Sequence, residues 1–133
     1  MKPKILIVNA NYYAKISSDL KHNAEIVLDK ENIHIGKRNI INVPGVFEIP
    51  VVIAKNIKKY DGFIALGCVI KGETPHFELI SQATIDAIMK LSIDYKKPIG
   101  NGIITCLNKE QAISRSKTKG QEAATAVINV LKF

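Results

Sequence analysis

The chain has 133 residues, of which 47% are hydrophobic, and this predicts one domain, residues 1–133, that buries a single core. No run approaches the roughly 18 apolar residues of a membrane span, and the start has no long apolar signal region, so we expect a cytoplasmic protein without membrane contact. The formal net charge is +7, but the lysines are scattered and only Arg38 and Arg115 are arginines, which favours anionic small molecules over nucleic acid as partners.

Apolar periodicity predicts strands that alternate with helices. In chain order, the predicted elements are strand 4–8, helix 14–30, strand 39–43, helix 47–57, strand 62–70, a helix through Leu79 and Leu91 that ends before Pro98, strand 101–107, a helix opened by Asn108, and a terminal helix ending at Lys132. Pro50 is tolerated only near the first turn of its helix. Asn108 with Gln111 is typical of an N-cap pair, and Gly120 is expected to separate the last two helices.

The predicted fold class is α/β. The strands are too apolar for an exposed antiparallel sheet, and their alternation with helices predicts a three-layer α/β/α sandwich around a four-stranded parallel sheet, flavodoxin-like in architecture. Ligands of such sheets bind beyond the carboxyl ends of the strands. Four segments therefore become candidates for a site: 9–13, 44–48, 71–76 and the residues from Asn108 onward.

The segment after the central strand, "GETPHFE", combines a turn with a histidine. Gly72 frees the backbone, Thr74 can cap a helix, and Pro75 fits a first helical position, so an uncovered helix N-terminus is expected here. Such an end favours a phosphate, and the imidazole of His76 could carry protons beside it. The alternative is that His76 is only a polar residue at a helix start.

The other strand ends carry weaker signals. Glu48 in "VPGVFEIP" could accept hydrogen bonds from a polyol or could only cap a helix. Tyr12 and Tyr13 could stack on a flat heterocycle or pack on their own helix. Arg115 offers a planar fork suited to phosphate, with Lys119 four residues on, although both could belong to a solvated helix face.

Metal and nucleotide chemistry find no support in the sequence. Cys68 and Cys106 lie inside apolar runs without a CxxC motif, which predicts reduced core residues. His22, His34 and His76 have no ordered spacing, so no metal site is expected. Neither GxGxxG nor GxxxxGK[ST] occurs, so dinucleotide and P-loop chemistry are not predicted.

Taken together, the strand ends resemble those of the lumazine synthase family. The blocks "VPGVFEIP", "GCVIKGETPHFE", "NGIITCLNKEQAISR" and "KGQEAA" are similar to that family's blocks and follow the same order along nearly the whole chain. The resemblance implies a condensation of 5-amino-6-ribitylaminouracil with 3,4-dihydroxy-2-butanone 4-phosphate in riboflavin biosynthesis. The products are 6,7-dimethyl-8-ribityllumazine, phosphate and water, and neither a metal nor an organic cofactor is implied.

The resemblance also implies roles for individual residues. His76 occupies the position of the family's catalytic histidine, and Tyr12 that of the aromatic residue that stacks on the pyrimidine. The ribityl chain would be held by Val46, Phe47 and Glu48, and the ring pocket lined by Val69 and Ile70. Backbone donors for the phosphate would come from Gly72, Glu73 and Thr74.

The remaining implied residues belong to a neighbouring subunit. Arg115 and Lys119 match the family's phosphate-side cations, and they would come, with the segment around Asn101, from the next copy in a homopentamer. Family members that form capsids commonly add an N-terminal strand to a neighbour's sheet, whereas only three residues precede the first predicted strand here. We therefore expect a free pentamer or a pair of pentamers.

Two departures from the family pattern and two competing readings remain. Tyr12 replaces the commoner phenylalanine or tryptophan, and the segment 116–118 is short, which makes the match of Lys119 weaker than that of Arg115.

One alternative is an archaeal-type riboflavin synthase, which uses two lumazines, but "GETPH" with Arg115 favours a phosphate substrate. The other is a flavodoxin-like or response-regulator module, which the lack of an acidic cluster after the first strand disfavours.

Overall fold

The computed structural model describes residues 2–36 and 39–133, so Arg38 lies outside the described residues. In chain order the elements are β1 (Ile5–Ala10), α1 (Ala14–Lys30), β2 (Ile40–Val43), the short 3₁₀ helix η2 (Val46–Glu48), α2 (Ile49–Asn56), β3 (Gly62–Ile70), α3 (His76–Tyr95), β4 (Ile99–Cys106), α4 (Lys109–Arg115) and α5 (Lys119–Leu131). The strands form one parallel sheet in the order β2-β1-β3-β4. No helix in these two ranges is long and apolar enough to cross a membrane.

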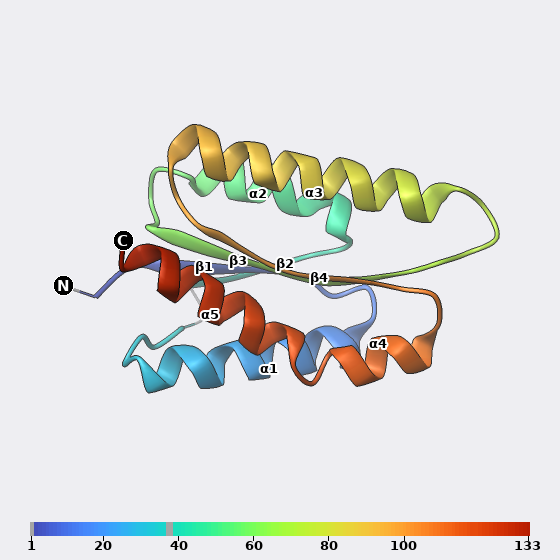
Figure 1. Cartoon of the computed structure of the whole chain (residues 1–133), viewed down its shortest axis with the longest axis horizontal. Helices are drawn as coiled ribbons and strands as arrows, with labels where there is room; N and C mark the ends of the chain where they lie inside the picture. The colour runs from blue at the N-terminus through green and yellow to red at the C-terminus, as the bar shows by residue number, and fades with distance from the viewer. Residues whose placement is uncertain (1, 37–38) are drawn as a thin grey trace.

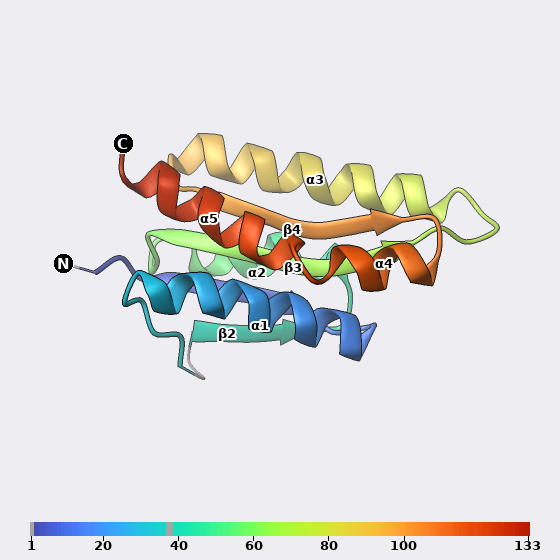
Figure 2. The ribbon, with the colours of Figure 1, turned by 60° about the horizontal axis from the view of Figure 1, so that its bottom comes forward.

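Helices cover both faces of the sheet, which confirms the predicted α/β sandwich. Helices α2 and α3 lie on one face, and α1, α4 and α5 lie on the other (Figures 1 and 2). All four strands run toward the same edge, so their carboxyl ends gather at the end opposite to the two chain termini (Figure 1).

Side chains of the central strand β3 pack into the core on both faces of the sheet. Its side chains alternate between faces, so Ile64 and Leu66 pack toward α1 and α5 while Phe63 and Ala65 pack toward α2 and α3. All four are fully buried. A strand covered on both faces explains why the sequence shows a continuous apolar run from 62 to 70 rather than an alternating one.

Three predicted boundaries shift for identifiable reasons. The amide of Lys4 donates to the Asp61 carboxylate at 2.7 Å, so β1 begins one residue later than predicted, and it continues to Ala10 because that residue pairs with Val43. β4 begins at Ile99, which pairs with Phe63. The predicted helix 47–57 is a 3₁₀ turn followed by α2, which places Pro50 in the first turn of α2, as expected.

The expectation that Gly120 separates the last two helices is wrong. The chain turns at 116–118, and Gly120 is buried in the first turn of α5, where this helix crosses α1. A Cβ atom at this position would overlap the backbone carbonyl of Leu20 in α1. The glycine therefore allows a close approach of two helices and does not end one.

Gly120→Ala is expected to lower the free energy of unfolding by about 1–3 kcal/mol, because the added methyl group meets backbone that cannot move aside. Alanine is otherwise favoured over glycine in helices by about 1 kcal/mol, so a net loss identifies the steric contact. Urea denaturation followed by circular dichroism measures the change. Gly36→Ala is the matched control, since a Cβ there meets nothing within 4 Å, and equal stability of both variants would contradict the prediction.

Candidate functional site

An open cavity of about 480 Å³ lies at the carboxyl edge of the sheet. The ends of β1 and β3 form its base, and the turn after β2 and the first turns of α3 form its sides. The strand order β2-β1-β3-β4 reverses direction between β1 and β3, and ligands of open α/β sheets bind at this kind of switch point. The lining residues are Ala10, Tyr12, Tyr13, Gly45, Val46, Phe47, Glu48, Cys68, Val69, Ile70, His76 and Ile80.

Seven of the residues singled out from the sequence meet at this cavity. They come from three separate strand ends and one helix start, namely Tyr12, Val46, Phe47, Glu48, Val69, Ile70 and His76. The parallel arrangement brings them together, because the carboxyl ends of parallel strands share one edge of the sheet.

His76 is the first residue of α3, and it is exposed at the cavity. Pro75 is the N-cap, so the helix starts one residue later than the predicted start at Pro75. The hydroxyl of Thr74 accepts a hydrogen bond from the His76 amide at 3.4 Å. Thr74 thus satisfies one of the amides that a helix start leaves without intrahelical partners.

Glu48 closes the turn after β2, which is the capping role that its position suggested. One carboxylate oxygen accepts a hydrogen bond from the Gly45 amide at 3.0 Å, while the Glu48 amide donates to the Gly45 carbonyl at 3.2 Å. These bonds close the turn after β2 and fix the carboxylate at the cavity wall. Next to it, Val46 packs closely on Gly67 of β3, where a Cβ atom would lie 2.6 Å from the valine methyl.

The cavity lining also includes Tyr13, whose role the sequence left open, and Cys68, which the sequence did not predict for the site. The rings of Tyr12 and Tyr13 form an edge-to-face pair with centroids 4.9 Å apart, so Tyr13 supports the ring of Tyr12, whose side chain is 75% exposed. Cys68 was assigned to the core, and it is buried and free as predicted, but it also lines the cavity near the end of β3.

The surroundings of Cys68 oppose ionisation of its thiol. Burial raises the pKa of Cys68 from its ordinary value of 9.0 to about 12, the nearby Cys106 adds to the rise, and the positive charge of Arg115 partly offsets it. Burial likewise raises the pKa of Tyr13. The cavity floor therefore carries a neutral thiol and a neutral phenol, not a nucleophile.

Gly72, Glu73 and Thr74 lie beside the cavity and do not line it. All three are exposed in the loop between β3 and α3. An ion pair at 3.9 Å between the Lys71 ammonium and the Glu78 carboxylate connects the two ends of this loop.

Asn101 and Arg115 lie at the open edge of β4 rather than in the cavity. The Cys106 carbonyl accepts from the amide of Lys71, the residue that follows β3, so the backbone groups of alternate residues such as Ile103 and Thr105 point away from the sheet. The Asn101 side chain accepts a hydrogen bond from the Ile103 amide at 3.1 Å, and the Arg115 guanidinium donates to the Thr105 carbonyl at 3.1 Å. Lys119, the first residue of α5, is likewise not part of the cavity wall.

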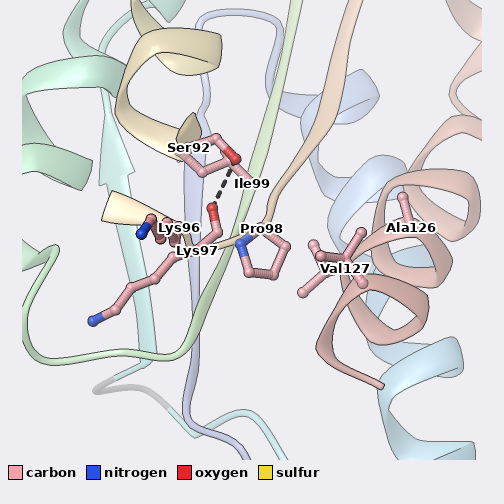
Figure 3. A pocket seen from close by; sticks show the side chains of 8 residues that line it. Ser92, Lys96, Lys97, Pro98, Ile99, Ala126 and Val127 are labelled. Atoms are coloured by element: carbon pink, nitrogen blue, oxygen red, sulfur yellow. Dashed lines mark hydrogen bonds between the residues drawn. The ribbon is translucent and has the colours of Figure 1, made fainter. Parts of the chain in front are cut away.

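A second hollow of about 320 Å³ lies at the opposite end of the sheet, where β4 begins (Figure 3). Its walls are the C-terminal end of α3 and the side of α5. The Ser92 hydroxyl donates to the Lys97 carbonyl at 2.7 Å and so closes the end of α3 (Figure 3), while the Lys97 ammonium donates to the Ile57 carbonyl at 2.6 Å. These polar groups serve the helix ends, and none of the residues predicted for the site lies here.

The described residues hold no cluster of three or more histidine, cysteine, aspartate or glutamate side chains that could bind a metal ion. The cavity itself is lined by an imidazole, a carboxylate and aromatic rings, and the start of α3 borders it. Such groups move protons, bind polyols and phosphates, and stack on flat rings.

A parallel α/β sandwich with this cavity at its switch point is a small-molecule-binding α/β protein. Comparison with known proteins gives the family: the model for 6,7-dimethyl-8-ribityllumazine synthase matches residues 2–133. Proteins named 6,7-dimethyl-8-ribityllumazine synthase from Bartonella tribocorum and Agrobacterium fabrum are 44% and 39% identical to this chain. The alignments cover 96% and 99% of this chain and 87% and 95% of the two relatives.

The chain therefore belongs to the 6,7-dimethyl-8-ribityllumazine synthase family. The resemblance drawn from the four sequence blocks is confirmed, and the chain is a transferase of riboflavin biosynthesis. The two alternatives, a riboflavin synthase and a non-enzymatic signalling module, gain no support from the relatives.

The raised pKa of Cys68 predicts a loss of stability at alkaline pH. A thiol whose pKa is higher in the folded than in the unfolded state stabilises the fold fully below pH 9, and this contribution is lost as the pH rises toward about 12. Urea denaturation at pH 8 and at pH 10.5 measures the decline for the wild-type protein and for Cys68→Ala. The variant is expected to lose less stability between the two pH values, and an equal loss would contradict the assignment.

Proposed function

We propose that the cavity is where this enzyme condenses 5-amino-6-ribitylaminouracil with 3,4-dihydroxy-2-butanone 4-phosphate. The observation that supports this most directly is that seven residues, predicted separately at four places in the sequence, surround one cavity. The reaction joins two small molecules and releases phosphate and water, so the site needs a place for each substrate and a group that moves protons between them.

The pyrimidine substrate fits the interior of the cavity. Val69 and Ile70 offer an apolar wall for its ring, and the exposed ring of Tyr12, held from the side by Tyr13, can stack on the flat heterocycle. The ribityl chain carries several hydroxyl groups, and the carboxylate of Glu48 accepts hydrogen bonds from such groups. Its fixed position beside Gly45 supports this role.

The phosphate substrate fits the mouth of the cavity. The loop at Gly72–Thr74 and the start of α3 present backbone amides there, and a helix start favours an anion. His76 lies between this anion site and the cavity interior. Formation of the imine, elimination of phosphate and closure of the second ring each move protons, and an imidazole at this place can donate and accept them.

Arg115, Lys119 and Asn101 complete the site from a neighbouring subunit in our proposal. Asn101 and Arg115 face outward from the edge strand β4, and none of the three lines the cavity of its own chain. A contact between the cavity side of one copy and the β4 edge of the next uses two different surfaces, and such contacts form a ring when the rotation between neighbouring copies closes. We propose a homopentamer.

Exposed apolar side chains support an interface on both of these surfaces. Phe47 and Val51 are 59% and 58% exposed beside the cavity, and Met89 and Leu107 are 59% and 60% exposed near β4. Large apolar surfaces of this kind are costly in water unless a partner covers them. Residues 1–133 act as one domain in this proposal, and the two free buried cysteines agree with a reducing compartment such as the cytoplasm.

The purified protein is expected to form a lumazine from the two named substrates without added metal, measured by the fluorescence of the product. His76→Ala is expected to lower the rate by about 10- to 10⁴-fold, the effect of losing one acid–base group, while both substrates still bind. His22→Ala, a change on the exposed face of α1, is the matched control and keeps the wild-type rate. A wild-type rate in a folded His76→Ala variant would remove His76 from the mechanism.

The shared site predicts complementation between two defective variants. In rings co-assembled from equal amounts of His76→Ala and Arg115→Ala chains, about one quarter of the sites combine an intact His76 with an intact Arg115, because each is present in half of the chains. Activity is therefore expected to rise above that of either variant alone, toward about one quarter of wild type. Light scattering should give the mass of five chains or of ten.

The control for this experiment co-assembles His76→Ala with the double variant His76→Ala/Arg115→Ala, which can form no intact site. If the first mixture is no more active than this control, each site is built within a single chain.

A further inference from the structure

We infer that Asn108 and Gln111 are positioning residues for the phosphate-bearing substrate. Their side chains form a clamp at the junction of β4 and α4, and this junction clamp holds α4 at the angle that places the Arg115 guanidinium at the open edge of β4. The inference rests on the proposed role of Arg115 as a phosphate ligand and extends that role to two residues that do not touch the substrate.

The junction clamp consists of two hydrogen bonds that cross the turn in opposite directions. The Asn108 side-chain oxygen accepts from the Gln111 amide at 2.9 Å, and the Gln111 side-chain oxygen accepts from the Leu107 amide at 2.8 Å. The first bond caps α4, and the second ties its first turn back to the residue that follows β4. Together they fix both the start and the direction of a helix of only seven residues.

Arg115 lies one helical turn beyond Gln111, on the same side of α4. Its guanidinium donates to the Thr105 carbonyl at 3.1 Å, on the strand from which the helix emerges. This bond forms only if α4 folds back along the end of β4, and the junction clamp fixes that direction. A guanidinium has five N–H donors, and the described residues engage it at Nη1, which leaves a fork available for an anion.

The far end of α4 is held independently of the junction clamp. Ser116, which follows Arg115, is fully buried, and its carbonyl accepts from the Asn23 side chain of α1 at 3.3 Å. Ala112 is also fully buried. The helix therefore remains attached to the core when the clamp is broken, and only its N-terminal direction loosens. Loosening this end spreads the guanidinium over several positions, which weakens phosphate binding without unfolding the chain.

The test compares Asn108→Ala, Gln111→Ala and Asn108→Ser in the assembled enzyme, with Arg115→Ala as the reference. The two alanine variants are expected to raise KM for the butanone phosphate about 2- to 30-fold, the range that loss of one helix cap gives. KM for the pyrimidine and kcat at saturation should stay close to wild type. Asn108→Ser keeps an acceptor at the cap and should restore most of the affinity, and Gln111→Ala should add little in the Arg115→Ala background.

The possible outcomes separate this inference from the proposed function. A raised KM for the butanone phosphate in Arg115→Ala and in both clamp variants, with rescue by Asn108→Ser, supports the inference. If Arg115→Ala raises this KM but the clamp variants do not, or if they lower kcat alone as a general loss of folded protein would, the inference is overturned and the role of Arg115 stands. If Arg115→Ala leaves this KM unchanged, the proposed phosphate role is wrong and the inference fails with it.

Discussion

The burial of β3 on both faces is the constraint from which the site follows. A strand that is covered by α1 and α5 on one side and by α2 and α3 on the other must have neighbours on both edges, and β1 and β4 supply them in parallel. Parallel pairing in turn requires each connection to cross the sheet through a helix. Every strand therefore ends at the same edge, and the turns that follow them meet around one cavity.

This arrangement divides the groups of the proposed site between two surfaces. The groups proposed for the pyrimidine and its ribityl chain follow β1, β2 and β3, whereas the arginine proposed for phosphate lies on the outer side of the edge strand β4. Arg115 does not line the cavity of its own chain. In the proposed ring, the edge of one subunit reaches the switch point of the next, so assembly and catalysis depend on the same contact.

Much of the fold could be predicted because apolar periodicity and strand burial are local properties of the sequence. The run from 62 to 70 and the helix from 14 to 30 have the predicted bounds. The prediction for Gly120 was wrong because a glycine that ends a helix and a glycine that lets two helices touch look the same in a sequence. The two cases are distinguished only in the structure, where α5 crosses α1 at Gly120. The place of Cys68 in the cavity lining was missed, because it depends on the side to which the end of a strand turns. The position of Asn101 and Arg115 at the open edge of the sheet depends on the strand order, and hydrophobic periodicity does not predict that order.

The hydrogen bonds along the outer side of β4 also affect the isolated subunit, before it assembles with other copies. An edge strand with free amides and carbonyls is a template for any extended chain, and it promotes aggregation. Here the Asn101 side chain occupies the Ile103 amide, and Arg115 occupies the Thr105 carbonyl two residues further on. In a newly folded subunit, the outward amide of Ile103 and the outward carbonyl of Thr105 are therefore already hydrogen-bonded and cannot pair with another strand. The side chains assigned to substrate binding in the finished ring would also protect the isolated subunit from indiscriminate strand pairing.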